Sequence, residues 1–189
     1  MSLPTRLARY LEQREPTVLD ASSSKPCAVL LAMIPGDDDY EVVYTLRSEH
    51  LPNHKGQVSF PGGKQAPSDD SLMTTALREA EEEIGLRRGD VEILGRLDDV
   101  YTMATDFVIT PFVGLLPAAY EFTTNPHEVS ELFTVSLGAL QKPEHQGVAD
   151  REWRGATFPV DVITAGSHAI WGATHSITKN LIECLHGLS

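Results

Sequence analysis

The chain has 189 residues, of which 41% are hydrophobic and 22% are charged, and these proportions are typical of a folded globular domain. They exclude a fibrous or disordered chain, and the longest apolar run, Cys27–Pro35, is far shorter than the roughly 20 residues of a membrane helix. The formal net charge of −12 argues against nucleic acid or an anionic membrane as a partner. A small phosphorylated substrate is compatible with this charge, because divalent cations can stand between two anionic groups.

Two features bear on the location of the protein. The first turns carry Arg6, Arg9 and Glu12 in place of the apolar segment of a secretory signal. The two cysteines, Cys27 and Cys184, lie in apolar contexts far apart in the sequence, so we expect both to be buried and reduced. The resulting expectation is a cytoplasmic protein, either a monomer or a homodimer.

Strands and helices alternate along the chain. Helical spacing predicts a helix at Thr5–Glu15, and two β-rich runs, Cys27–Ile34 and Tyr40–Arg47, predict a hairpin. The later predicted elements are a strand at Gln57–Phe60, a turn at Pro61–Gly63, a helix at Ser68–Gly85, strands at Val91–Tyr101, Phe107–Leu116 and Glu128–Val135, a helical turn at Leu137–Gln141, a strand at Thr157–Val160 and a closing helix at Ile170–Leu185. This order predicts an α/β (α+β) fold layered around one sheet.

The helix expected at Ser68–Gly85 is the most informative segment. At roughly 100° per residue, Glu79, Glu82 and Glu83 fall within an arc of about 100° on one face. Arg78 precedes Glu82 by four residues, a spacing at which ion pairs form along a helix. A second face is apolar and suits the core: Met73, Leu77, Ala80 and Ile84. The helix has candidate caps at Ser68, Asp69 or Asp70 and at Gly85.

Three neighbouring carboxylates have two interpretations. An acidic helix face is most often solvated surface, although each exposed pair repels by about 0.2–0.5 kcal/mol. A divalent cation removes that repulsion, and Mg²⁺ and Mn²⁺ prefer oxygen ligands. Gly62 and Gly63, at the end of a predicted strand, favour the metal interpretation, because a backbone without side chains can approach an ion or a phosphate closely.

Together these residues resemble the Nudix box, Gly-x5-Glu-x7-Arg-Glu-U-x-Glu-Glu-x-Gly-U, where U is aliphatic. Gly63 opens the box, and residues 78–86 (Arg-Glu-Ala-Glu-Glu-Glu-Ile-Gly-Leu) complete it. The spacing from Gly63 to Arg78 is one residue longer than in the pattern, and Asp69 or Asp70 stands where the first glutamate belongs.

A second stretch is similar to the signature of the coenzyme A diphosphatase subfamily, Leu-Leu-Thr-x-Arg-Ser-x3-Arg-x3-Gly-x3-Phe-Pro-Gly-Gly. It consists of Val43–Ser48 followed by Gly56–Gly63. Pro52 replaces the second arginine, so one phosphate contact of the subfamily is in question here. Residues 125–129 (Asn-Pro-His-Glu-Val) and 170–174 (Ile-Trp-Gly-Ala-Thr) also resemble this subfamily, and we expect Trp171 to anchor the start of the closing helix in the core.

The resemblance implies a Nudix fold, a mixed β-sheet sandwiched between α-helices, with residues 1–189 as one Nudix hydrolase domain and the box at about 63–86. It also implies that Mg²⁺ or Mn²⁺ is bound by Glu79, Glu82 and Glu83, helped by the Gly63 carbonyl. Arg78 would hold these carboxylates in place.

The remaining site residues have more than one interpretation. The family takes its general base either from the box or from a later loop, and the candidates here are Glu79 and Glu128, with Glu131 third. Glu128 could instead be a solvated acid at a strand edge. Arg47 and Lys64 are candidate substrate contacts, although a structural ion pair is the alternative for Arg47.

Three functions compete. The first is the metal-dependent cleavage of coenzyme A or its derivatives to 3′,5′-ADP and 4′-phosphopantetheine. The second, favoured by Pro52, is a Nudix hydrolase of ADP-ribose, NADH or nucleoside triphosphates. The third is a non-catalytic ligand-binding domain, but such domains usually lose box glutamates, and this chain keeps all three. In each case the partner is a small nucleoside diphosphate derivative or a related nucleotide.

Overall fold

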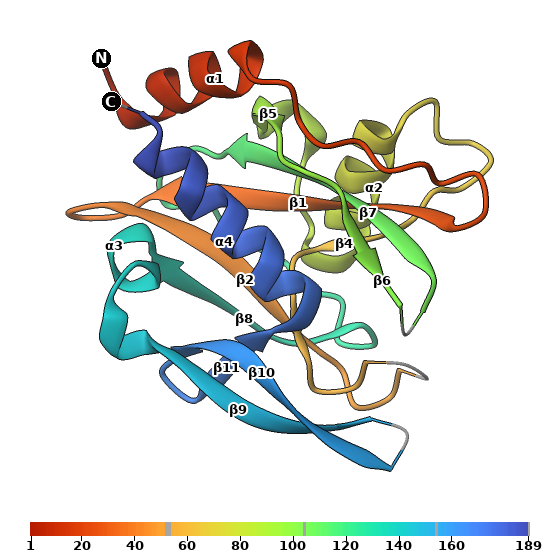
Figure 1. The fold of residues 1–189 in the computed structure, drawn as a ribbon. Helices are drawn as coiled ribbons and strands as arrows, with labels where there is room; N and C mark the ends of the chain where they lie inside the picture. The colour runs from red at the N-terminus through yellow and green to blue at the C-terminus, as the bar shows by residue number, and fades with distance from the viewer. Residues whose placement is uncertain (52–53, 104, 154, 189) are drawn as a thin grey trace.

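The computed structural model describes residues 1–51, 54–103, 105–153 and 155–188, and a mixed eight-stranded sheet lies at its centre (Figure 1). Its strands are β1 (Lys25–Pro35), β2 (Tyr40–Arg47), β3 (Val58–Ser59), β4 (Gly62–Lys64), β5 (Glu92–Arg96), β6 (Val100–Thr102), β7 (Phe107–Leu115) and β8 (Val129–Ser136). The central path runs β3-β2-β1-β7-β5, while β4 pairs with β1, β6 with β7 and β8 with β2. Only the β1–β7 pair is parallel among the described strands, so the sheet is mixed, as expected.

A smaller antiparallel sheet and four helices surround this centre. The smaller sheet has the order β11-β10-β9 and consists of β9 (Gln146–Trp153), β10 (Ala156–Ala165) and β11 (His168–Trp171). The helices are α1 (Leu3–Gln13), α2 (Leu72–Ile84), α3 (Leu137–Leu140) and α4 (Gly172–His186), with short 3-10 turns at Arg88–Asp90 and Pro143–His145. In Figure 1, α4 crosses the near face of the large sheet and α2 lies behind it, so helices cover both faces.

The apolar run of β1 is explained by its position in the middle of these layers. Successive side chains of a strand point to opposite faces, and both faces of β1 are covered. Leu31 and Met33 therefore pack on the α4 side, whereas Leu30 and Ala32 pack on the α2 side, and all four are fully buried.

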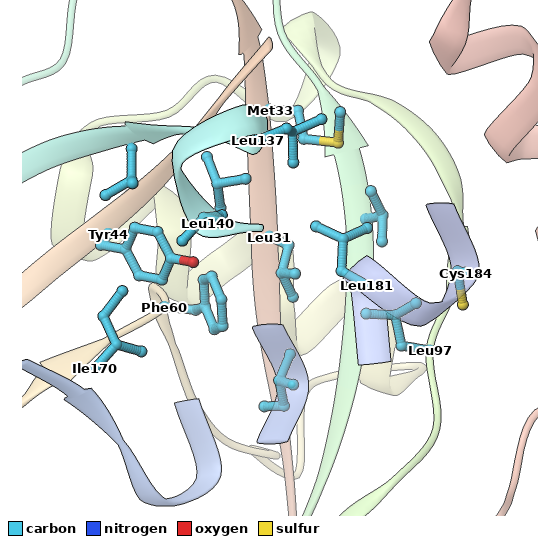
Figure 2. Close-up of a cluster of buried hydrophobic side chains, with 14 of the residues drawn as sticks. Leu31, Met33, Tyr44, Phe60, Leu97, Leu137, Leu140, Ile170, Leu181 and Cys184 are labelled. Carbon is cyan, nitrogen blue, oxygen red and sulfur yellow. The ribbon is translucent and has the colours of Figure 1, made fainter. Parts of the chain in front are cut away.

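The core on the α4 side combines residues from the whole length of the chain. Tyr44 packs on Phe60, with ring centroids 4.8 Å apart, and its hydroxyl is hydrogen-bonded to Thr178 of α4 at 3.0 Å. Figure 2 shows this cluster, which includes Leu31, Met33, Tyr44, Phe60, Leu97, Leu137, Leu140, Ile170, Leu181 and Cys184. Both cysteines are buried and free, which confirms the expectation for Cys27 and Cys184.

The start of α2 differs from the prediction. The helix begins at Leu72 rather than Ser68, and Ser71, which was not a predicted cap, accepts the N–H of Thr74 at 3.1 Å. Met73, predicted to face the core, is 40% exposed in the first turn of α2, whereas Ala76, in the next turn, is fully buried.

The prediction was least accurate in the second half of the chain. The strand expected at Val91–Tyr101 is divided into β5 and β6, because Asp98 and Asp99 leave the sheet to accept hydrogen bonds from the backbone N–H groups of Thr17 and Leu19. Strand β9 was missed because most of its residues are exposed and the alternating apolar pattern is absent. Trp171 ends β11 and is the N-cap residue of α4, so it does stand at the start of the closing helix, but it is only partly buried rather than anchored in the core.

Among the described residues, no helix is both long and apolar enough to cross a membrane. Pro52, which replaces an arginine of the subfamily signature, lies outside the described residues.

Candidate metal and catalytic site

The C-terminal half of α2 presents the predicted glutamates beside the segment that joins β7 to β8. The helix ends at Gly85, whose φ of 67° is left-handed, a conformation that glycine adopts without strain. A Cβ atom at Gly85 would lie 2.8 Å from the carbonyl oxygen of Thr123. The missing side chain therefore lets the segment between β7 and β8 pack directly on the end of the helix.

The three glutamates differ in their exposure to water. The side chain of Glu83 is 4% exposed, that of Glu79 is 16% exposed and that of Glu82 is 54% exposed. The predicted carboxylate face thus runs from the interior to the surface. The solvated-surface interpretation holds for Glu82 alone.

Glu83 is a buried carboxylate with few partners. Its Oε2 accepts the backbone N–H of Gly62 at 3.3 Å, and its Oε1 lies 3.7 Å from Nη1 of Arg47. Burial raises the pKa of Glu83 to about 8, although Arg47 and the N–H of Gly62 oppose this shift. Charge at this position is therefore unfavourable unless a further cation approaches.

Glu79 lies directly against the glycine turn. A Cβ atom placed on Gly63 would be 2.5 Å from the carboxyl carbon of Glu79, so a larger residue at position 63 would displace this carboxylate. Burial raises the pKa of Glu79, while Arg78 acts in the opposite direction. The predicted association of Gly63 with a box glutamate is thus present in the fold.

Arg78 connects several parts of the site. Its guanidinium donates to Glu79 at 2.9 Å and to Glu82 at 3.1 Å, which places it as the resemblance implied. It also donates to the carbonyl oxygen of Lys64 at 3.1 Å and to both carboxylate oxygens of Asp69 at 2.9 Å. One planar group thus joins the helix, the glycine turn and the loop between them.

Asp69, rather than Asp70, is the aspartate that contacts Arg78. It accepts the N–H of Ala66 at 2.8 Å and the hydroxyl of Thr75 at 3.0 Å, in addition to the two bonds from Arg78. The bonds from Arg78 are the main reason that the pKa of Asp69 lies well below its usual range. The extra residue in the box is accommodated in this loop, and the shorter aspartate still reaches the arginine.

Glu128 is tied to both sides of the cluster through the backbone. Its carbonyl accepts the N–H of Ser48 at 2.9 Å, and Asn125, three residues earlier, donates its own N–H to the carbonyl of Glu83 at 2.9 Å. Because Arg47 also reaches Glu83, strand β2, helix α2 and the loop before β8 form a closed ring of contacts. Glu128 is only partly exposed, and its charge contributes to raising the pKa values of both Glu79 and Glu83.

Two other candidates point away from these carboxylates. Glu131, the third candidate base, lies 3.1 Å from Nε2 of His168 on β11, and that histidine stacks on Phe133 of the α4-side core. The ammonium of Lys64 lies 5.3 Å from the ring centroid of Phe107. The backbone of Lys64 belongs to the site through Arg78, whereas its side chain is directed to β7.

The comparisons with known proteins identify the family of the chain. A family model described as NUDIX domain matches residues 25–156. A Yersinia enterocolitica protein with the name uncharacterized Nudix hydrolase NudL is 36% identical over 173 residues, which cover 92% of this chain and 87% of that protein. The chain belongs to the Nudix hydrolase family.

Solved structures show the same fold as this Nudix hydrolase. A Nudix hydrolase from Alicyclobacillus acidocaldarius superposes with a TM-score of 0.54 at 18% identity, covering 86% of this chain and 92% of that chain. The NUDIX domain of Shewanella oneidensis NrtR, complexed with ADP ribose, gives 0.50 at 21% identity, covering 72% and 87%. At these identities the likeness concerns the fold alone, and it confirms the predicted Nudix architecture.

The residues of this Nudix hydrolase fit a divalent metal in chemistry but are not arranged as a finished ligand shell. Over residues 1–51, 54–103, 105–153 and 155–188, no three acidic, histidine or cysteine side chains converge on one point. Arg78 draws Glu79 and Glu82 toward itself, while Glu83 is turned to Gly62 and Arg47. The donors are all oxygens, and buried Glu83 lacks a full countercharge, which suits Mg²⁺ or Mn²⁺.

Sequence reasoning missed two contributors to the site. The N–H of Gly62 holds Glu83, and the side chain of Asn125 donates to Glu128 at 3.2 Å. A backbone donor leaves no sequence signal beyond the glycine itself. Residues 125–129 were noted only for their resemblance to the coenzyme A subfamily, and that resemblance does not indicate that the amide of Asn125 faces a carboxylate.

Proposed function

We propose that this Nudix hydrolase cleaves the pyrophosphate bond of coenzyme A or its derivatives, giving 3′,5′-ADP and 4′-phosphopantetheine. The observation that carries the proposal is the contact of Arg47 with Glu83, whose Nη1 and Oε1 atoms are 3.7 Å apart. It brings the segment that resembles the coenzyme A signature against the box. The coenzyme A signature and the Nudix box therefore support a single shared site.

In this proposal the metal site uses Glu79, Glu82 and Glu83, with the carbonyl of Gly63 as a further oxygen. Bound Mg²⁺ or Mn²⁺ would neutralise the diphosphate oxygens and lower the pKa of the attacking water. Arg78 is also bonded to Asp69 and to the carbonyl of Lys64, so it would stay in place if it released the glutamates to the ion.

The chain's own groups supply the rest of the reaction. Water adds to one phosphorus atom, the bridging P–O bond breaks, and the proton of the water passes to a base. Glu128 is the proposed base and Glu79 the alternative, because both carboxylates lie at the cluster. Arg47 is the proposed contact for a substrate phosphate, and Lys64 is a second one that requires its side chain to leave Phe107.

A Nudix hydrolase of ADP-ribose, NADH or a nucleoside triphosphate is the second candidate. It is favoured by Pro52, which removes the second arginine of the coenzyme A signature. The Nudix domain of NrtR, which holds ADP ribose, shares the fold but only 21% of its residues with this chain. A non-catalytic binding domain is disfavoured because all box glutamates are retained.

The proposal extends to the whole chain. Residues 1–189 would act as one domain, because Leu7 of α1 and Leu181 of α4, both outside the matched segment, are fully buried in the same core. The partner is a small nucleoside diphosphate derivative, and nucleic acid and membranes are disfavoured by the net charge of −12. The two buried free thiols support a cytoplasmic protein, and a monomer and a homodimer are both compatible with the proposal.

The test is a panel of diphosphates with Mg²⁺ and with Mn²⁺, followed by separation of products. We expect coenzyme A to have the highest kcat/KM and to yield 3′,5′-ADP. A preference for ADP-ribose or NADH would favour the second candidate. No 3′,5′-ADP at high enzyme concentration would defeat the coenzyme A assignment.

A further inference from the structure

Asn125 stands where the loop after β7 meets the end of α2. Its N–H donates to the carbonyl of Glu83 at 2.9 Å, and its own carbonyl accepts the N–H groups of Glu128 at 3.0 Å and Val129 at 2.8 Å. The turn from Asn125 to Glu128 is therefore held by the last turn of the helix that carries the box glutamates.

The side-chain amide of Asn125 has one orientation that satisfies its surroundings. Its Oδ1 accepts the backbone N–H of His127 at 3.1 Å, and its Nδ2 donates to Oε1 of Glu128 at 3.2 Å. A backbone N–H requires an acceptor and a carboxylate requires a donor, so exchanging the two amide atoms would break both bonds. The amide is thus aimed at the carboxylate by the same turn that it stabilises.

Glu128 depends on this amide. Among the described residues, the amide of Asn125 is the only hydrogen-bond donor to the Glu128 carboxylate. The backbone of Glu128 is fixed at the other side by the N–H of Ser48, next to Arg47. The backbone is therefore anchored twice, and one hydrogen bond selects among the rotamers of the side chain.

We infer that Asn125 is a positioning residue, which holds the Glu128 carboxylate at the box glutamates for proton transfer during hydrolysis. The role in proton transfer rests on the proposed function, whereas the hydrogen bond from Asn125 to Glu128 is a property of the turn. A hydrogen bond to a charged group contributes about 1.5–3 kcal/mol, so losing it should lower the productive population of Glu128 by roughly 10- to 100-fold.

The first test is Asn125→Asp, which keeps the size of the side chain and the acceptor for His127 but removes the donor to Glu128. We expect kcat to fall by roughly 10- to 100-fold with KM changed less than about twofold. Thr124→Asp is the matched control, because it adds the same charge to an exposed neighbour and leaves Asn125 intact. Wild-type kcat in Asn125→Asp, or an equal loss in Thr124→Asp, would overturn the inference.

The second test exchanges donor and acceptor. Asn125→Asp combined with Glu128→Gln rebuilds the hydrogen bond without a carboxylate at position 128. We expect its melting temperature to match the wild type, while its kcat stays as low as that of Glu128→Gln alone. Recovery of kcat would mean that the bond serves only the fold, and the inference would be wrong.

Crystal structures of the wild type and of Asn125→Asp with Mg²⁺ give a readout that needs no turnover. We expect the Glu128 side chain to leave the cluster in the variant while residues 123–129 keep their backbone. An unmoved carboxylate would refute the positioning role even in an active enzyme. A wild type that cleaves no diphosphate would instead defeat the proposed function, and the structures would still decide whether Asn125 holds Glu128.

Discussion

The two faces of the large sheet are built from the same strands but are organised differently. On the α4 side, Leu31 and Met33 meet an apolar layer, and the buried hydroxyl of Tyr44 is paired with that of Thr178. On the α2 side, Leu30 and Ala32 also meet apolar residues, but the same turns of the helix carry the charged contacts of Arg78 and Glu83.

This difference indicates that the α4 side mainly stabilises the fold, whereas the α2 side carries the proposed chemistry. The α4 side satisfies its few polar groups internally, as a folded core requires. The α2 side keeps Glu83 buried beside an arginine 3.7 Å away, and it crowds Glu79 and Glu128 nearby. Strongly perturbed carboxylates of this kind are typical of functional sites, and the opposite layer provides the stability that they do not.

The largest expected effect is a difference in kcat between variants of two glutamates on opposite faces of the sheet. Glu83→Gln removes a proposed metal ligand and should lower kcat by about 1,000-fold, or roughly 4 kcal/mol in the activation free energy. Glu131→Gln, which loses only its contact with His168, should change kcat by less than about twofold. Equal kcat values for the two variants would break the distinction between the faces.

A core substitution on the α4 side should have the reverse signature. Leu31→Ala leaves a cavity in a fully buried position and should lower the free energy of unfolding by about 2–5 kcal/mol. The folded fraction should keep the wild-type kcat. Urea unfolding and active-site titration measure the two quantities, and Val18→Ala, at a 66% exposed position, serves as the control. A loss of kcat without a loss of stability would contradict the assignment of roles.

The aspartate pair next to the helix offers a finer test. Asp69→Asn weakens two bonds to Arg78 and should reduce activity or Mg²⁺ affinity by about 10- to 100-fold, as is usual for groups that hold metal ligands. Asp70→Asn changes an exposed neighbour and should have no measurable effect. Calorimetric Mg²⁺ titration of both variants decides between Asp69 and Asp70.

The smallest expected effect is a pH dependence of stability without metal. Because burial raises the pKa of Glu83 from 4.5 to about 8, the folded protein binds more protons than the unfolded chain between these values. The contribution of Glu83 to the free energy of unfolding is therefore present below pH 4.5 and is lost as the pH rises toward 8. Relaxation around the carboxylate should limit the loss to about 1 kcal/mol, or 2–4 °C in melting temperature.

The measurement is thermal unfolding in a chelator between pH 5 and 8, for the wild type and Glu83→Gln. The variant has no carboxylate at this position, so its melting temperature should fall less over the same range. Added Mg²⁺ should restore more stability at pH 8 than at pH 5.5, because the ion favours the ionised ligand. Parallel curves for the two proteins would contradict the buried state of Glu83.

Much of this comparison was available from the sequence. The position of α2 followed from periodicity, the mixed sheet followed from the resemblance to the Nudix family, and the grouping of Glu79 and Glu83 near Gly63 followed from the box. What the sequence could not give was the difference in burial between Glu82 and Glu83, since neighbouring residues on one arc receive the same prediction. Glu83 lies against Gly62 of β4 and Arg47 of β2, whereas Glu82 is bonded to Arg78 of its own helix.

The missed elements have a common physical cause. Strand β9 forms an exposed edge whose side chains meet water on both sides, so its composition resembles a loop. Asp98 and Asp99 interrupt the predicted Val91–Tyr101 strand through hydrogen bonds to a segment about 80 residues earlier in the chain. Long-range contacts of this kind leave no periodic signal.

The anchoring of Arg78 has a consequence for how quickly the site can change state. Two of its partners, Asp69 and the carbonyl of Lys64, take no part in the proposed ligand set. Capture or loss of an ion should then require rotation of the glutamate side chains rather than movement of the backbone, and for the exposed Glu82 such rotations take picoseconds to nanoseconds. The backbone around α2 should therefore have the same conformation in the presence of a chelator and at saturating Mg²⁺. The loss of water from the ion would then limit the rate at which the ion binds.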